Sequence, residues 1–194
     1  MIIILTGKTA SGKDTIKDAL LNKYPNLKRV LTTTSRAPRR GETNGLEYNF
    51  LSREIFLKLV SEGKFVEYVE YGGNLYGTQK AELEKHLNEN LLWRIDPSRA
   101  GEAREFIKRA FPKKIADRLI KKLIVIYITA LDSVILERLT KRNLPAEEIQ
   151  KRMADDKTIW EKYQGSYDFV VENVPGRLDE CLDNIVRLID SHVQ

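Results

Sequence analysis

The chain has 194 residues, of which 42% are hydrophobic and 31% charged, a composition typical of a globular protein with one well-formed core. Its formal net charge of +5 favours anionic ligands, although nucleotides and nucleic acids would satisfy this charge equally well. A single cysteine excludes an internal disulfide and a zinc cluster, and two histidines leave little material for a histidine-based metal site.

No segment reads as a targeting or membrane-spanning element. The apolar run at residues 1–5 is too short for a signal peptide and lacks its basic region. No run approaches the roughly 18 consecutive apolar residues that a membrane span requires. We therefore expect a cytoplasmic protein that does not bind membranes.

A glycine-rich stretch follows the first predicted strand, the apolar run at residues 2–5, and precedes a predicted helix. It matches the phosphate-loop pattern G-x-x-x-x-G-K-[ST] at every position except the last. The glycines let backbone N–H groups surround a phosphate, while the lysine and the helix N-terminus add positive charge. A glycine turn that binds nothing is the alternative. The predicted ATP-binding residues are Gly7, Lys8, Thr9, Ala10, Ser11, Gly12, Lys13, Asp14 and Thr15.

Asp14 is the departure from the phosphate-loop pattern, because a serine or threonine hydroxyl normally holds Mg²⁺ at that position. A carboxylate would repel triphosphate oxygens unless a metal ion lay between them. Since Mg²⁺ prefers oxygen ligands, we expect Asp14 to ligate it directly or through water. Thr15 is the next candidate.

An arginine-rich loop follows a second strand predicted at about residues 28–33. Residues 32–50 read TTTSRAPRRGETNGLEYNF, with three arginines among hydroxyl groups and a tyrosine. Arginine matches phosphate oxygens with two parallel hydrogen bonds, so this loop predicts a second anion site. Composition alone leaves a solvated basic loop open as the alternative.

Together, the phosphate loop and the arginine-rich loop resemble the guanylate kinase family. Residues 33–50 resemble its GMP-binding signature, and the G-N-L-Y-G-T of residues 73–78 follows its G-N-x-Y-G-[S/T] form, after a strand predicted at residues 65–71. The resemblance spans roughly residues 1–96 and 124–190, with the more specific motifs in the first half. It implies ATP as phosphoryl donor, Mg²⁺ as cofactor and GMP or dGMP as acceptor.

The resemblance also implies roles for the acceptor-site residues. A carboxylate can accept hydrogen bonds from guanine N1–H and the exocyclic amine, which adenine does not offer together. An outward-facing residue on an edge strand is the alternative for Glu67. In the implied GMP site, the phosphate is held by Arg36, Arg39, Tyr48 and Tyr76, the arginines are oriented by Glu42, and guanine is read by Thr32, Glu67 and Thr78, with Asp96 at the guanine or in the hydration shell of the metal.

A second departure lies at the end of the strand predicted at residues 91–96, which follows a helix predicted at residues 79–90 from Leu83 and Leu87 on one face. Where the family usually has L-D-I-D, this chain has W-R-I-D, so Arg94 replaces the first aspartate. Arg94 and Asp14 are departures of opposite charge, and we hypothesise that they pair or that Arg94 contacts phosphate.

Helices predicted after a buried strand at residues 123–129 carry three further arginines. Asp132 is expected to cap the first of these helices, which runs to about residue 141. By resemblance to nucleoside monophosphate kinases, the arginines would belong to a lid over ATP; salt bridges between residues four apart are the alternative. The predicted catalytic residues are Lys13, Arg36, Arg138, Arg142 and Arg152.

The segment at residues 97–122 has a basic face but few interleaved aromatic residues, which favours a solvated helix over a nucleic-acid surface. We expect no nucleic-acid partner, and a monomer or homodimer.

The predicted fold is α/β and resembles that of P-loop NTPases, with three layers, a parallel central sheet, a small mixed β region for GMP and a helical lid. A single domain is expected, with its core at residues 1–33, 81–137 and 161–194, the GMP-binding region at 34–80 and the lid at 138–160. The expected reaction is ATP + GMP → ADP + GDP. The alternatives are a kinase resembling ribose 1,5-bisphosphate phosphokinases, whose loop also commonly reads G-K-D, and a catalytically inactive guanylate-kinase-like binding module.

Overall fold

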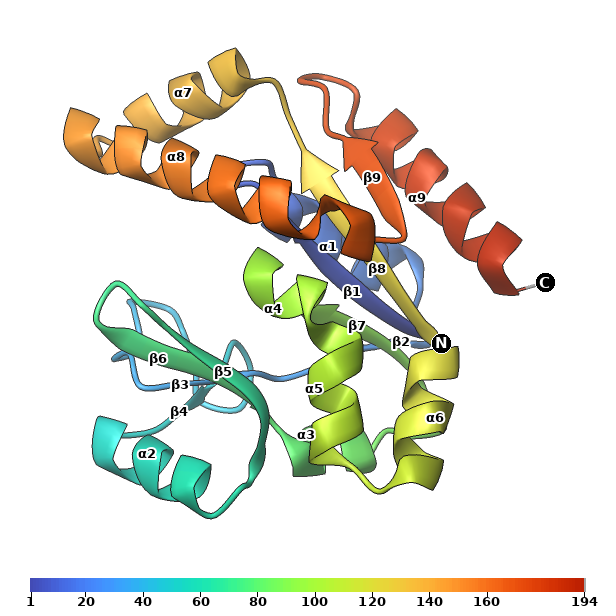
Figure 1. Ribbon diagram of the computed structural model, residues 1–194. Helices are drawn as coiled ribbons and strands as arrows, with labels where there is room; N and C mark the ends of the chain where they lie inside the picture. Colours follow the sequence, from blue (N-terminus) through green and yellow to red (C-terminus); the bar gives the residue numbers. More distant parts are fainter. Residues whose placement is uncertain (194) are drawn as a thin grey trace.

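A computed structural model describes residues 1–193, with side chains through residue 191. Its centre is a five-stranded parallel sheet with the strand order β2-β7-β1-β8-β9 (Figure 1). The first strand therefore lies between β7 and β8, and its carboxyl end opens beside theirs. The strands of this sheet are β1 (Ile2–Gly7), β2 (Leu27–Arg29), β7 (Asn90–Arg94), β8 (Leu123–Thr129) and β9 (Phe169–Glu172).

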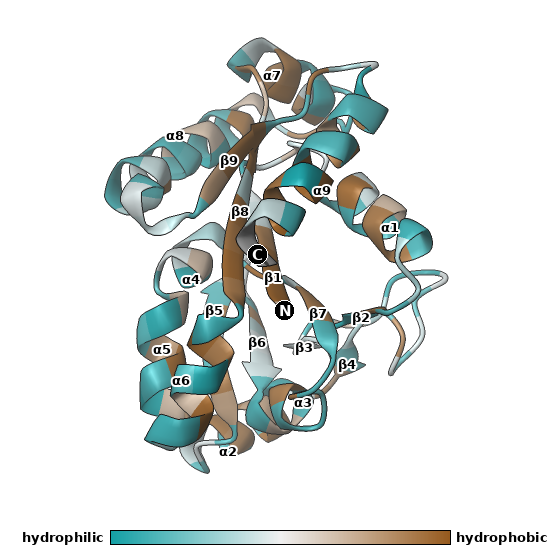
Figure 2. Cartoon of the chain, turned by 90° about the vertical axis from the view of Figure 1, so that its right-hand side faces the viewer, coloured by the Kyte–Doolittle hydropathy of each residue, from teal (hydrophilic) through white to brown (hydrophobic). Residues whose placement is uncertain are grey.

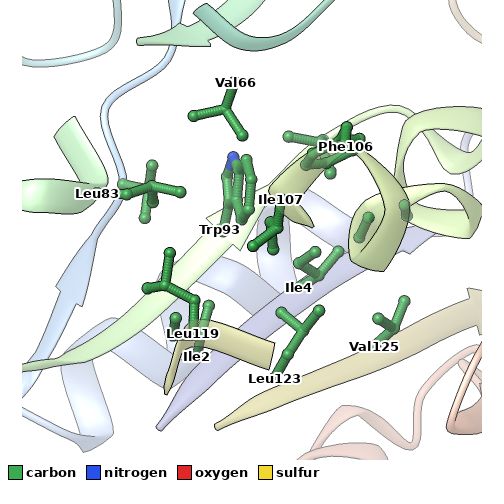
Figure 3. Packing of buried hydrophobic residues seen from close by; sticks show 14 of the residues in the cluster. Ile2, Ile4, Val66, Leu83, Trp93, Phe106, Ile107, Leu119, Leu123 and Val125 are labelled. Carbon is green, nitrogen blue, oxygen red and sulfur yellow. The ribbon is translucent and has the colours of Figure 1, made fainter. Parts of the chain in front are cut away.

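Helices cover both faces of this sheet, which confirms the predicted three-layer α/β fold. Ile3 on β1 packs in one cluster with residues of α1 (Lys13–Lys23) and α9 (Leu178–Val193). Its neighbour Ile4 points to the other face and packs in the cluster that contains Trp93 and Phe106 (Figure 3). The hydrophobic strands β1 and β8 consequently lie inside, beneath mainly hydrophilic helix surfaces (Figure 2). The second face is covered by α4 (Pro97–Gly101), α5 (Ala103–Ala110) and α6 (Lys113–Lys121).

A second, mixed sheet lies beside the carboxyl edge of the first, as predicted from the sequence (Figure 1). Its order is β4-β3-β6-β5, with β3 parallel to β4 and antiparallel to β6. A separate small core, in which Phe56 stacks on Phe65 beside Leu75, joins this sheet to α2 (Arg53–Ser61). The strands are β3 (Thr33–Thr34), β4 (Asn49–Phe50), β5 (Phe65–Tyr71) and β6 (Asn74–Gln79).

Two helices pack together on the opposite side of the sheet's carboxyl edge (Figure 1). They are α7 (Asp132–Thr140) and α8 (Ala146–Tyr163), and their shared core contains Ile135, Leu139 and Ile149. Ala10 of the glycine-rich loop is buried in the same cluster. The helical pair is thus packed directly on the predicted phosphate loop.

Three local expectations are corrected by the structure. The second strand, predicted to reach residue 33, ends at Arg29, and the helix predicted at residues 79–90 is only α3 (Lys80–Glu84) followed by turns. These turns redirect the chain into β7, so the helix cannot continue. Asp132 does not cap α7, because Leu131 occupies the cap position and the Asp132 carboxylate pairs with Lys8 instead.

Among residues 1–193, no helix combines the length and apolar character that crossing a membrane requires.

Candidate active site

The glycine-rich loop between β1 and α1 has a backbone that only glycine accommodates at two positions. Gly7 has φ +140°, and a Cβ atom there would lie 2.0 Å from the carbonyl oxygen of Ile128. Gly12 has φ +92°, and its Cβ would lie 2.3 Å from Nδ2 of Asn173. These positive φ values curl the chain before the first turn of α1. The loop therefore has the conformation that its glycines predict.

Lys13 is the first residue of α1, and its side chain reaches back to the start of this loop. Its Nζ donates to the carbonyl oxygens of Gly7 at 2.9 Å and Lys8 at 2.5 Å. Burial, together with the nearby charge of Arg94, lowers the pKa of Lys13 to about 8, while the carboxylate of Asp156 opposes this shift. The lysine therefore remains mainly protonated at pH 7 and holds its positive charge against the start of the loop.

Asp14 and Thr15 are both exposed at the start of α1. Oδ1 of Asp14 lies 3.3 Å from Nε of Arg94 and 3.9 Å from Nζ of Lys17. The two departures from the expected patterns thus form an ion pair, as hypothesised. Among the described residues, no group of three or more histidine, cysteine, aspartate or glutamate side chains could hold a metal. Asp14 offers one exposed carboxylate, which suits an ion that takes its other ligands from substrate phosphates and water.

Two carboxylates, one on α7 and one on α8, pair with donor groups of the glycine-rich loop. The backbone N–H of Thr9 donates to Oδ2 of Asp156 at 2.8 Å, and Nζ of Lys8 lies 2.7 Å from Oδ1 of Asp132. Burial raises the pKa of Asp156 to about 6, against the lowering effect of the Thr9 hydrogen bond. Lys8, Asp132 and Asp156 line a cavity of about 330 Å³ between the loop and the helical pair. Sequence reasoning missed both aspartates as site residues, because no motif marks them.

The three predicted lid arginines have different surroundings. Nη1 of Arg138 donates to the carbonyl oxygen of Ala10 at 2.9 Å, so this arginine faces the glycine-rich loop. Arg142 is exposed just after α7. Arg152 pairs with Glu148 at 2.5 Å, four residues away on α8, and also lies 5.7 Å above the ring of Tyr71 on β5. Arg152 therefore forms the helical salt bridge considered above and also reaches the second sheet.

Arg36 is held firmly within the arginine-rich loop. Its Nη1 and Nη2 donate to the two carboxylate oxygens of Glu42 at 2.9 and 3.0 Å, and this pairing raises its pKa. The backbone N–H of Arg39 donates to the same carboxylate at 2.7 Å. Glu42 thus fixes one guanidinium group and the backbone at the second arginine, whose side chain is exposed.

Aromatic residues surround the Arg36 guanidinium. Its Cζ lies 5.6 Å from the ring centroids of both Tyr48 and Phe50. The rings of Tyr48 and Tyr76 are 6.3 Å apart and meet edge to face. The Arg36 guanidinium group and the rings of Tyr48 and Tyr76 therefore lie together beside the second sheet. Thr32 lies half-buried immediately before β3, and its carbonyl oxygen accepts from the N–H of Asn49 at 2.9 Å.

Glu67 is a buried carboxylate with only 6% of its surface exposed, which excludes the outward-facing alternative. The Thr78 hydroxyl donates to its Oε1 at 2.7 Å. Burial raises the pKa of Glu67 to about 7, while the hydrogen bond from Thr78 and the charge of Arg99 lower it. Asp96, whose charge further raises this pKa, caps α4 by accepting from the N–H and hydroxyl of Ser98 at 2.9 and 2.6 Å.

Comparisons with known proteins match this chain along nearly its whole length. The sequence profile of the family described as guanylate kinase matches residues 1–192. A guanylate kinase of Synechocystis sp. is 32% identical over 189 residues, covering 97% of this chain and 92% of the relative. A guanylate kinase of Rubrobacter xylanophilus is 44% identical over 90 residues, which are 46% of this chain and 47% of the relative.

Solved structures show the same fold. The crystal structure of guanylate kinase from Anaplasma phagocytophilum superposes with a TM-score of 0.67 at 24% identity, covering 98% of this chain and 85% of that one. Shikimate kinase from Acinetobacter baumannii superposes less closely, with a TM-score of 0.53 at 17% identity, covering 98% and 93%. The chain therefore belongs to the guanylate kinase family, a group of ATP-dependent kinases.

Proposed function

We propose that the protein transfers the γ-phosphoryl group of ATP to the phosphate of GMP, forming ADP and GDP in a Mg²⁺-dependent reaction. The observation that carries this proposal is the presence of two groups at the second sheet. One is the buried Glu67, which accepts a hydrogen bond from Thr78. The other is the guanidinium group of Arg36 with the two tyrosine rings beside it. One part suits a guanine base and the other suits a phosphate. A nucleotide that carries both groups would satisfy both parts.

On the acceptor side, the second sheet supplies the proposed GMP site. Guanidinium and phenol groups would hold the phosphate as hydrogen-bond donors, and the carboxylate of Glu67 would accept from guanine N1–H and the exocyclic amine. A base without both donors would leave a buried carboxylate unpaired, which is costly and would make the site selective. The proposed acceptor residues are Thr32, Arg36, Arg39, Glu42, Tyr48, Glu67, Tyr76, Thr78 and Asp96.

On the donor side, residues 7–15 would wrap the ATP phosphates. Mg²⁺, when bound, would neutralise charge on the β- and γ-phosphates. Asp14 would hold it together with phosphate oxygens, with Thr15 as the alternative ligand, although the ion pair with Arg94 competes for the same carboxylate. If Asp14→Ser leaves both turnover and Mg²⁺ dependence unchanged, Asp14 does not hold the metal.

The helical pair α7–α8 would act as a lid. Phosphoryl transfer needs cations around the moving group and exclusion of water, and a closing lid supplies both. Arg138 is already at the loop, whereas Arg142 is exposed and Arg152 is paired with Glu148. We propose that closure over both nucleotides brings these three arginines, with Lys13 and Arg36, to the transferring phosphoryl group.

A substrate panel tests the proposal. Purified protein is assayed with ATP and Mg²⁺ against GMP, dGMP, AMP, UMP and ribose 1,5-bisphosphate, with ADP formation as the readout. Turnover on GMP or dGMP, with little on AMP and UMP, is the expected result. Turnover on the sugar bisphosphate alone would instead indicate a different phosphorylated acceptor. A protein that binds GMP without turnover would be a binding module.

A further inference from the structure

We propose that Trp93 is a positioning residue for base recognition, whose indole N–H orients the Thr78 hydroxyl so that Glu67 is held as an acceptor for guanine. The inference rests on the proposed function for its ligand. Trp93 is on β7 of the central sheet, whereas Thr78 and Glu67 are on β6 and β5 of the second sheet. The contact therefore links the two sheets at the base-binding carboxylate.

When Glu67 is ionised, the chemistry of the three groups fixes the direction of this chain of hydrogen bonds. Nε1 of Trp93 lies 2.9 Å from Oγ1 of Thr78, and an indole nitrogen can only donate. The hydroxyl must therefore accept from Trp93 with a lone pair. Its single proton is left for Oε1 of Glu67, 2.7 Å away. The chain runs from indole to hydroxyl to carboxylate.

The burial of Trp93 and Thr78 makes the direction of these hydrogen bonds important for the ionisation of Glu67. Trp93 and Thr78 are both 0% exposed, so water does not replace a lost partner at either group. The indole bond occupies one of the two lone pairs of the hydroxyl oxygen and polarises its O–H group, which makes the hydroxyl a stronger donor to an ionised carboxylate. The indole bond thus favours the ionised carboxylate, which is the form that accepts from guanine. The charged groups that act on Glu67 from the adjoining α4 segment are Arg99 and Asp96.

The packing around Trp93 fixes the orientation of its indole ring. Its ring meets Phe106 edge to face at 5.8 Å, and it lies among Val66, Leu83 and Ile107 (Figure 3). The ring nitrogen points to the side of Val66, the residue next to Glu67 on β5 (Figure 3). A hydrocarbon side chain could fill this space, but it could not supply the donor.

The first test follows the indole proton itself. Trp93 and Trp160 are the two tryptophans, so a Trp160→Phe variant assigns their indole resonances in an NMR spectrum. We expect the Trp93 indole resonance to shift with pH around a midpoint near 7, the pKa of Glu67, and Glu67→Gln to abolish this shift. A Trp93 resonance that is insensitive to pH, or that titrates equally in Glu67→Gln, would overturn the proposal.

The second test is a double-mutant cycle on GMP affinity, measured by calorimetry. Trp93→Phe removes the donor and keeps an aromatic ring, and we expect it to weaken GMP binding about two- to twelvefold, as loss of one hydrogen bond would. ATP affinity should be unchanged. In a Thr78→Val background, which lacks the hydroxyl, Trp93→Phe should have no further effect on GMP.

The cycle separates positioning from packing. A merely structural role would lower thermal stability and weaken GMP binding by the same factor in both backgrounds, and that result would overturn the proposal. If Trp93→Phe does not fold, the NMR titration of the otherwise intact protein decides. A protein that binds no GMP would overturn the proposed function, while the pH titration would still decide whether the hydrogen-bond chain controls Glu67.

Discussion

The two halves of the candidate site differ in how their polar groups are paired. In the second sheet, the pairs form between residues close in sequence, such as Arg36 with Glu42 and Glu67 with Thr78. In the glycine-rich loop, Thr9 and Lys8 are instead paired with aspartates from α8 and α7, more than a hundred residues away. The second sheet, which we propose as the acceptor half, is therefore already assembled, whereas ATP bound at the glycine-rich loop, the proposed donor half, would have to displace contacts made by α7 and α8.

The largest difference between the two halves of the candidate site is expected when Lys13 is replaced. Lys13→Ala should lower kcat about 10²- to 10³-fold, because the variant loses a preorganised charge beside the phosphates. GMP affinity, measured by calorimetry, should change little, since Lys13 belongs to the donor half. A comparable loss of GMP affinity would show that the two halves are not independent.

Arg36 should produce a large effect confined to the acceptor half. Arg36→Ala removes charge-assisted hydrogen bonds and should weaken GMP binding about 10- to 100-fold, with ATP affinity unchanged. Arg40→Ala, an exposed arginine in the same loop, is the matched control. Equal losses in the two variants would mean that only the net charge of the loop matters.

The pH dependence of GMP affinity should reveal the buried carboxylate. The pKa of Glu67 is raised to about 7, so the free carboxyl is largely protonated at pH 6 and must lose its proton to accept from guanine. Lowering the pH from 8 to 6 should therefore weaken GMP binding about tenfold. In Glu67→Gln only the titration of the GMP phosphate should remain. An identical pH profile of GMP affinity in the wild-type protein and in Glu67→Gln would show that Glu67 does not accept from guanine.

The smallest expected effect concerns the contact between Asp156 on α8 and the glycine-rich loop. Asp156→Ala frees the Thr9 N–H and removes a carboxylate that phosphate oxygens must displace. ATP binding should tighten about two- to tenfold in calorimetry, with GMP binding unchanged. Asp155→Ala changes the exposed neighbour on the same helix and serves as control. Weaker ATP binding in Asp156→Ala would indicate that this carboxylate helps to bind the nucleotide.

Sequence patterns predicted the strands that are continuously hydrophobic, but they did not predict contacts between segments distant in the chain. The apolar runs of β1 and β8 were identified because buried parallel strands are continuously hydrophobic. The helix expected at residues 79–90 was too long, since its apolar spacing did not reveal that the chain turns into β7. Asp132 was assigned to a helix cap because the tertiary ion pair with Lys8 has no local signal.

The sequence alone determined the fold class and the glycine-rich loop, because both depend on local spacing and residue chemistry. Its resemblance to guanylate kinases predicted the acceptor residues. The pairing of Asp14 with Arg94 was suggested by their opposite charges, but the 3.3 Å contact exists only because β1 and β7 are adjacent. Tertiary structure also decided that Glu67 is buried and that Trp93 donates to Thr78. The burial of Glu67 and the hydrogen bond from Trp93 both depend on the contact between the two sheets. That contact joins segments distant in sequence, so no local pattern predicts it.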